Sequence, residues 1–196
     1  VIIDKLDFSL TNDQKKTLEE INNDLCSSKK MFRLLQGDVG SGKTIVSLLA
    51  AFNTIISGFQ VSVMAPTEIL ARQHYNLAKK LFPKNLNIQF ISGKSDYKTK
   101  KNILNKLSAN EINIIFGTHA IFQKKVTYKN LGLIIIDEQH KFGVNQRKKL
   151  SDKGGNNCDI LLMTATPIPR TLTMTMYGDM DLSIIAEKPK LRKPIK

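Results

Sequence analysis

The stretch that decides the fold is MFRLLQGDVGSGKT, residues 31–44. Its first part, 31–36, is an apolar run that predicts a β-strand, and GDVGSGKT (37–44) follows at once, matching G-x-x-x-x-G-K-[ST] at every constrained position. Glycines let the backbone turn so that successive N–H groups face one anion, and the apolar helix expected over 43–57 adds its positive end. We therefore predict a phosphate-binding loop. The alternative is a glycine-rich turn that binds nothing.

Each residue of this loop has an expected task. The Lys43 side chain would reach the β- and γ-phosphates of a nucleotide and stabilise the charge that develops there, and the Thr44 hydroxyl would ligate Mg²⁺. The predicted nucleotide-binding residues in the loop are Gly37, Asp38, Val39, Gly40, Ser41, Gly42, Lys43 and Thr44.

Outward from the loop, short apolar runs alternate with longer segments of helical periodicity. The strands are expected at 31–36, 61–65, 88–91, 112–117, 131–137 and 159–164. The helices are expected at 12–25, 43–57, 67–82, 96–108, 144–151 and 170–177. This alternation predicts an α/β fold with a mostly parallel central sheet and helices on both of its faces.

A second carboxylate-bearing strand would complete a metal site beside the loop. Four apolar residues, 133–136, precede Asp137 and Glu138, which places both carboxylates at the end of a buried strand. Asp137 is expected to hold Mg²⁺ through water, and Glu138 to polarise the attacking water as a general base. Alone, the pair could equally cap a strand. Together with the loop it predicts a magnesium-dependent nucleoside triphosphatase.

The segment 67–82 shows helical periodicity, with Thr67 placed to cap its N-terminus and His74 on its apolar stripe. A core histidine is favoured over a ligand or a catalyst, because nothing else in that helix converges on it.

Composition sets wider bounds. The 196 residues are 41% apolar and 24% charged, which indicates one folded domain. The net charge of +13 favours a polyanionic partner, although 25 of the 30 basic residues are Lys, so a general lysine bias is the competing explanation. Two distant cysteines predict neither a disulfide framework nor a zinc site and favour a reducing cytoplasm. The most apolar segment, 45–59, is too short and too polar to span a bilayer, so no membrane partner is expected.

Further motifs indicate a family. Residues 137–140, DEQH, are a variant of the DEAD/DEAH box, and 164–166, TAT, stand where helicases of superfamily two carry their third motif. The chain from 10 to 193 resembles the first motor domain of RecG-type ATP-dependent DNA helicases. The matching segments are LLQGDVGSGKT (34–44), MAPTEILARQHY (64–75), GTHAIFQ (117–123), IIDEQHKFGVNQR (135–147) and MTATPIPRTLTMTMYGDMDLS (163–183).

The resemblance implies a RecA-like P-loop domain over 1–186, the first of two motor lobes, with 187–196 beginning the linker to the second. The family's full chain also carries a wedge domain that splits branched DNA. The implied function is an ATP- and Mg²⁺-dependent motor of a bacterial helicase that remodels stalled forks and Holliday junctions. The domain by itself is expected to be weakly active.

The resemblance also implies roles for individual residues. Gln14 would read the adenine edge, its alternative being a solvent-facing helix residue behind a Thr11 cap. Thr67 and Thr118 would contact DNA phosphates, although helix capping alone explains either. The elements that couple nucleotide state to DNA grip would be His140, Thr164, Thr166 and Arg170, with Arg170 not expected to be an arginine finger.

Two other functions stay open. The motor of the transcription-repair coupling translocase shares GDVG, GTH and TATPIPRTL, but it usually has an aromatic residue in place of Ser41 and Glu in place of Gln139. A non-catalytic nucleic-acid-binding module with a relic loop is the alternative of another class. The intact set of Lys43, Thr44, Asp137 and Glu138 argues against it.

Overall fold

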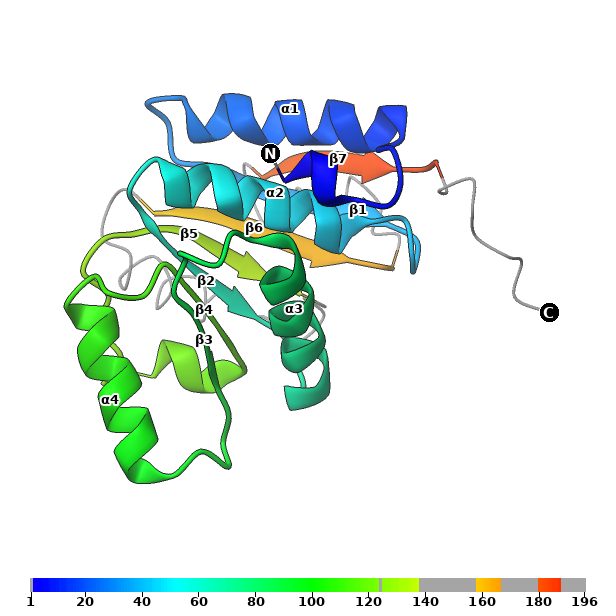
Figure 1. Ribbon diagram of the computed structural model, residues 1–196. Coiled ribbons are helices and arrows are strands. Elements are labelled where there is room, and N and C mark those ends of the chain that lie inside the picture. Colours follow the sequence, from blue (N-terminus) through cyan, green and yellow to red (C-terminus); the bar gives the residue numbers. More distant parts are fainter. Residues whose placement is uncertain (1, 124, 138–157, 167–179, 188–196) are drawn as a thin grey trace.

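The computed structural model describes residues 2–123, 125–137, 158–166 and 180–187, which form one seven-stranded sheet (Figure 1). The strands are β1 (Phe32–Gly37), β2 (Gln60–Met64), β3 (Ile88–Ile91), β4 (Ile114–Gly117), β5 (Leu131–Ile136), β6 (Asp159–Thr164) and β7 (Asp181–Ile185). Their order across the sheet is β3-β4-β2-β5-β6-β1-β7, and each pair of neighbours is parallel. The predicted α/β class with a parallel sheet is confirmed.

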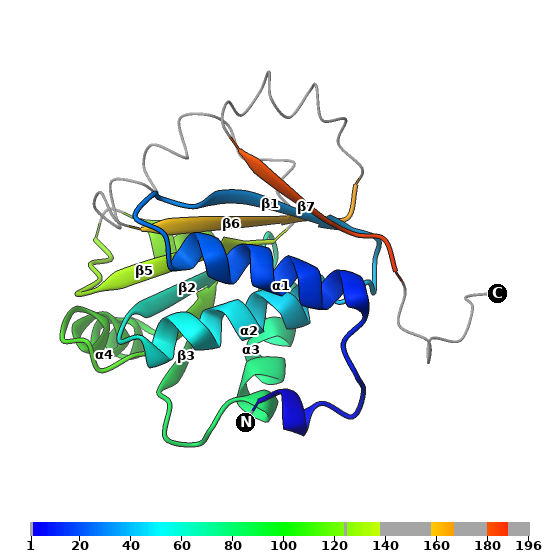
Figure 2. The ribbon, with the colours of Figure 1, turned by 90° about the horizontal axis from the view of Figure 1, so that it is seen from above.

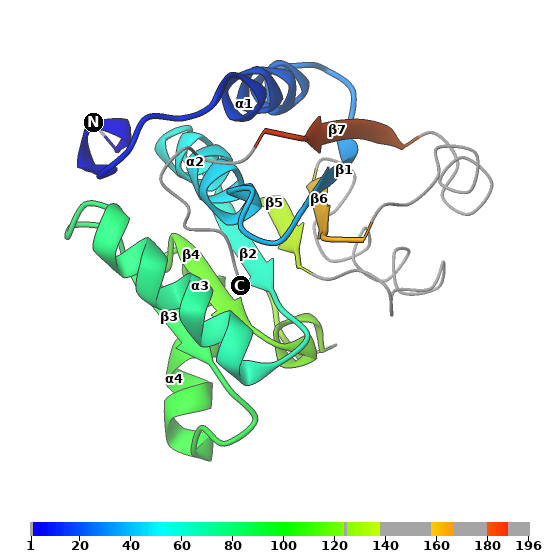
Figure 3. The same ribbon diagram turned by 90° about the vertical axis from the view of Figure 1, so that its right-hand side faces the viewer.

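Helices cover both faces of the sheet, as expected. The α-helices are α1 (Asn12–Leu25), α2 (Lys43–Ile56), α3 (Glu68–Leu81) and α4 (Tyr97–Ser108), and the short 3-10 helices are η1 (Ile3–Lys5) and η2 (His119–Phe122). Side chains of α1, α2 and α3 share one core with the sheet, and those of α4 and η2 share the core on its other face. Figure 2 shows α1 and α2 together on one side of β1 and β6, and Figure 3 shows α1 beside β7 and α3 beside β3 and β4.

Two expected helices, 144–151 and 170–177, lie outside the described residues. None of the helices that are described is long and apolar enough to cross a membrane.

The apolar runs became strands because both of their faces are buried. In β5 all six residues are buried, and successive side chains enter opposite cores: Leu133 and Ile135 face the side of α2, while Ile134 and Ile136 face the side of α4. This alternation is the period of two that a strand imposes, and covering both faces removes the need for polar positions.

The strand β7 was not among the predicted elements. Its sequence, DLSII, carries two polar residues in five, and only two of its positions are buried. It pairs with β1 at the end of the described sheet and is held there by a polar network on Arg33. Arg33 Nε donates to Asp24 Oδ2 of α1 at 2.7 Å, and Nη1 donates to Ser183 Oγ of β7 at 2.8 Å. The Ser183 hydroxyl donates in turn to Glu20 of α1.

The end of β7 is also fixed to the start of α1. Asp13 Oδ2 accepts from the backbone N–H groups of Ala186 and Glu187 at 2.9 and 2.8 Å, and Glu187 Oε2 accepts from Asn12 N at 3.0 Å. Glu187, expected to begin a linker, is therefore docked on α1. Residues 188–196 lie outside the described part, so the linker and the boundaries of the domain stay predictions.

Replacing Arg33 tests the network that holds β7. Arg33→Met keeps most of the apolar length but leaves Asp24 and Glu20 without their shared cation, so we expect the free energy of unfolding to fall by about 2 kcal/mol. Equilibrium urea unfolding measures it. Arg72→Met is the control, because Arg72 is exposed and its ion pair with Glu68 and its stacking on Phe90 contribute only about 0.5 kcal/mol each, so we expect a loss of about 1 kcal/mol or less. Equal losses in the two variants would contradict a special role for the Arg33 network.

Candidate functional site

Three predicted functional segments meet at the carboxyl edge of the sheet. The strands β5, β6 and β1 are neighbours in that order, and Asp137, Thr164 and Gly37 stand at or directly after their carboxyl ends. The pairing of Ile136 with Leu162 and of Gln36 with Thr164 keeps these ends in close register. Open α/β sheets bind their ligands outside this edge.

The glycine-rich loop turns through left-handed backbone conformations. Gly40 and Gly42 have φ angles of 79° and 92°, which side-chain-bearing residues rarely adopt. A Cβ on Gly42 would also collide with the Gln14 amide. The backbone angle at position 42 therefore favours glycine, and any side chain there would also displace the Gln14 amide.

The helix behind this loop begins without a capping side chain. The other described α-helices, α1, α3 and α4, are capped by Thr11, Thr67 and Asp96, whose side chains accept from backbone N–H groups of the first turn. The N-cap of α2 is Gly42, and the first turn of α2 holds no acidic residue. The first N–H groups of α2 and the positive end of its dipole thus receive no side-chain counter-charge from the cap or the first turn.

The Lys43 ammonium lies within the curve of the loop. Its Nζ donates to the backbone carbonyls of Gly37 and Asp38, the latter at 2.9 Å, and the residue is 9% exposed. Thr44 follows as the second residue of α2. A buried lysine thus stands beside a helix N-terminus that has no side-chain cap, and this arrangement suits the phosphates of a nucleotide.

The remaining loop residues divide by exposure. Asp38, Val39 and Gly40 are exposed at the tip, whereas Ser41 is buried. The Ser41 hydroxyl packs against Gly37 and has no hydrogen-bond partner among the described residues.

Gln14 is buried between α1 and the glycine-rich loop, which contradicts its solvent-facing alternative. Its side chain is 1% exposed, so it is not a solvent-facing helix residue. Its Oε1 accepts from Thr11 N at 2.9 Å, closing the capping box of α1, and its Nε2 donates to the Ser41 carbonyl at 2.7 Å. Both amide atoms are engaged within the protein, so this conformation joins α1 to the loop and does not present the amide to a base. An adenine contact stays a prediction that requires Gln14 to release Ser41.

Sequence reasoning missed the partner of Asp137. Asp137 Oδ2 lies 2.6 Å from His74 Nε2, and both side chains are largely buried. His74 is buried on α3 as expected, but its partner comes from the end of another strand. The signal for this contact is the sheet order, which a single sequence does not give. Among the described residues no three His, Cys, Asp or Glu side chains cluster into a metal site.

The two threonines predicted to contact DNA follow β2 and β4, which lie on the other side of β5 from β6 and β1. Thr67 comes shortly after β2 and Thr118 directly after β4, and these strands are adjacent. The exposed Thr67 caps α3 by accepting from Leu70 N at 3.3 Å. Thr118 precedes η2 and makes no side-chain capping bond. Lys94 follows β3, the next strand along, so basic and hydroxyl side chains share this part of the edge.

Of the predicted coupling residues, the structure describes two. The hydroxyls of Thr164 and Thr166 lie 3.0 Å apart, and Thr166 N donates to Thr164 Oγ1 at 3.2 Å. The Thr164 side chain therefore holds the backbone in a turn directly after β6. His140, Arg170 and the predicted general base Glu138 lie outside the described residues.

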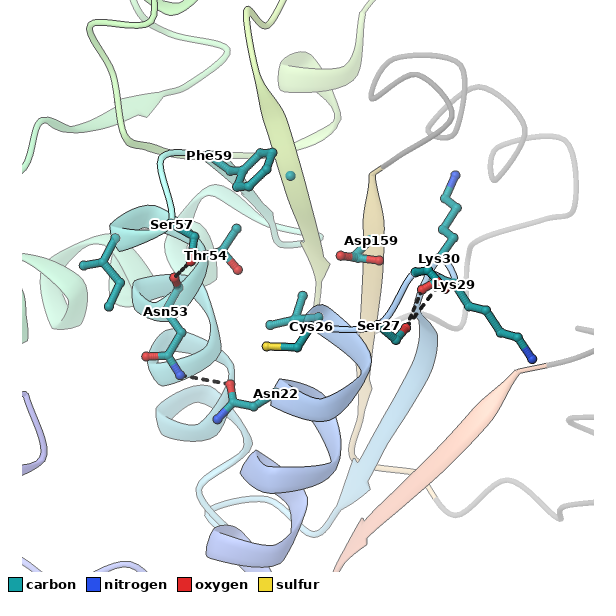
Figure 4. Close-up of a pocket in the computed structure, with 14 residues that line it drawn as sticks. Asn22, Cys26, Ser27, Lys29, Lys30, Asn53, Thr54, Ser57, Phe59 and Asp159 are labelled. Atoms are coloured by element: carbon teal, nitrogen blue, oxygen red, sulfur yellow. Dashed lines mark hydrogen bonds between the residues drawn. The ribbon is translucent and has the colours of Figure 1, made fainter.

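A hollow of about 530 Å³ lies at the opposite, amino edge of the sheet (Figure 4). Asn22 and Cys26 of the α1 end, Asn53 of α2 and Asp159 of β6 line it. Burial raises the pKa of the Asp159 carboxyl, and the hydrogen bond from Met31 N partly offsets that rise. The hollow contains none of the predicted site residues and lies away from the ligand edge of such sheets, so we assign it no role.

The chain is similar to several known proteins. The ATP-dependent DNA helicase RecG of Streptococcus pneumoniae is 53% identical over 190 residues, which are 97% of this chain and 28% of that protein. RecG of Bacillus subtilis is 50% identical over 194 residues, again covering 28% of its length. A solved structure of RecG bound to a three-way DNA junction matches 99% of this chain and 26% of that one, with a TM-score of 0.86 and 44% identity.

The chain thus spans little more than a quarter of the length of these relatives. The family model described as DEAD/DEAH box helicase matches residues 1–175. Since that match covers most of the sequence, the chain belongs to the DEAD/DEAH box helicase family.

Proposed function

We propose that the chain is the ATP-binding motor domain of an ATP-dependent DNA helicase that remodels branched DNA in recombination and repair. The observation that carries the proposal is the start of α2, which lies behind a phosphate-binding loop with no capping side chain and with a buried lysine inside the curve. The similarity to part of RecG supports the choice of DNA helicase over other ATP-driven machines.

In this proposal the loop and α2 bind the phosphates through backbone N–H groups, and Lys43 moves from the carbonyls of its own loop to the β- and γ-phosphates. Thr44 and Asp137 would hold Mg²⁺, which would neutralise charge on those phosphates. Asp137 suits this task because it directly follows β5, which is separated from β1 and its phosphate-binding loop only by β6. Glu138 orients the attacking water.

DNA binds across the other part of the carboxyl edge, at Thr67 and Thr118. Contacts there go to phosphates, so they would fix the position of the strand without reading its sequence. The proposed partners are branched DNA, such as the three-way junction in the related RecG structure, and the second motor lobe and wedge domain of a longer chain. Thr164, Thr166, His140 and Arg170 couple the two sites. Without the second lobe one wall of the nucleotide site is missing, so this domain alone hydrolyses ATP weakly.

Lys43→Ala tests the nucleotide site. In the full-length protein we expect DNA-stimulated kcat for ATP hydrolysis to fall by a factor of about 100 or more, because a cation aimed at the developing charge is removed. A coupled ATPase assay measures it. Lys29→Ala is the control, since Lys29 is exposed at the amino edge of the sheet. Unchanged hydrolysis by Lys43→Ala would rule out this site.

Gln14→Ala distinguishes the contact with the loop from base recognition. Because Gln14 holds the Ser41 carbonyl, its loss should weaken ATP and GTP binding by the same factor, about threefold to tenfold for one buried hydrogen bond. Equilibrium binding of both nucleotides to the full-length protein measures this. A loss confined to ATP would instead show that Gln14 leaves the loop and reads adenine.

Thr118→Val tests the DNA contact without disturbing a helix cap, since the Thr118 hydroxyl makes none. We expect junction DNA to bind the full-length protein about tenfold more weakly, the size of one hydrogen bond to a charged group, with no change in sequence preference. Fluorescence anisotropy measures the affinity. Thr127→Val, an exposed threonine before β5, is the matched control. The same affinity in both variants would exclude Thr118 from the DNA site.

A further inference from the structure

One buried contact joins the part of the edge proposed for DNA to the part proposed for the nucleotide. His74 belongs to α3, which follows β2, and Asp137 directly follows β5, the next strand across the sheet. The 2.6 Å between His74 Nε2 and Asp137 Oδ2 is a short hydrogen bond. The side chains are 8% and 12% exposed, so water competes little for either atom.

Other contacts fix the backbone positions of both Asp137 and His74. The Asp137 backbone N–H donates to the Met64 carbonyl at 2.8 Å, which fixes the start of its loop to the end of β2. His74 lies on the buried face of α3, and the adjacent Tyr75 packs its ring against Phe90 and Phe116, which anchors that helix on β3 and β4. The hydrogen bond therefore connects two rigid supports and restricts rotation of the carboxylate.

We infer that His74 is a positioning residue for Asp137: it holds one carboxylate oxygen so that the group faces the metal in a fixed orientation. This inference rests on the proposed function, in which Asp137 helps to hold Mg²⁺. Partners behind a ligand commonly set its orientation and its affinity for the metal. Without His74, the Asp137 carboxylate would lose this preferred orientation.

The position of His74 on α3 gives the contact a second consequence. Thr67, the proposed DNA contact, caps the same helix seven residues earlier, about two helical turns away. If DNA binding shifts α3, the shift would therefore be transmitted to the Asp137 carboxylate through α3 and the His74–Asp137 hydrogen bond.

The test uses the full-length protein and a matched pair of variants. In His74→Gln the amide nitrogen reaches about as far from the backbone as imidazole Nε2, whereas in His74→Asn a side chain of the same chemistry is one methylene too short. Gln73→Ala, on the exposed face of α3, controls for changes to the helix, and Asp137→Ala gives the effect of losing the carboxylate. Binding of a fluorescent ADP analogue is titrated with Mg²⁺ and repeated in EDTA.

We expect His74→Asn to raise the Mg²⁺ concentration for half-maximal binding about tenfold, with the affinity in EDTA unchanged. His74→Gln should restore most of the wild-type value, and Gln73→Ala should match the wild type. A purely structural role would instead weaken binding in EDTA as well, and to the same degree in both His74 variants, which would overturn the inference.

Two other outcomes would also overturn it, and they can be told apart. If Asp137→Ala raises the Mg²⁺ requirement but His74→Asn does not, His74 plays no positioning role while the proposed metal site stands. If the wild type shows no Mg²⁺-dependent nucleotide binding, the proposed function fails and the role of His74 fails with it.

Discussion

The uncapped start of α2 is the feature on which the site depends. A helix N-terminus with unsatisfied N–H groups costs stability unless a side chain, water or a ligand satisfies them, and three other described helices use a side chain. At α2 the N-cap is Gly42, which has no side chain to accept a hydrogen bond. Its backbone is left-handed, whereas capping residues such as Thr11 and Thr67 have an extended backbone. The surrounding contacts keep this arrangement in place: Gln14 holds the loop from one side, and Lys43 spans it from within.

The strand order places the residues proposed for nucleotide binding and those proposed for DNA binding along one edge of the sheet. Residues proposed for nucleotide and metal follow β5 and β1, the coupling threonines stand at the end of β6 between them, and residues proposed for DNA follow β4 and β2. The boundary between the groups falls between β2 and β5, where the His74–Asp137 bond crosses. Segments far apart in sequence thus lie side by side within one sheet, because the carboxyl ends of parallel strands meet at the same edge.

Most of the fold could be predicted because its signals are local. Apolar runs marked six strands to within about two residues, and helical periodicity with Thr11 and Thr67 caps marked α1 and α3. The strand β7 was missed because it is half polar and is held by Arg33 and by Asp13, contacts that no local pattern shows. The partners of Gln14 and His74 were missed for the same reason, since each comes from a distant segment, Ser41 and Asp137.

A crystal structure of the chain with ADP and Mg²⁺ would test the central claim most directly, because it shows where the phosphates lie. The account predicts the β-phosphate against the backbone N–H groups at the start of α2, with Lys43 Nζ released from the Gly37 carbonyl and the Asp137 carboxylate turned towards the ion. A nucleotide bound elsewhere, such as in the hollow at the amino edge, with Lys43 still on its own loop, would contradict it.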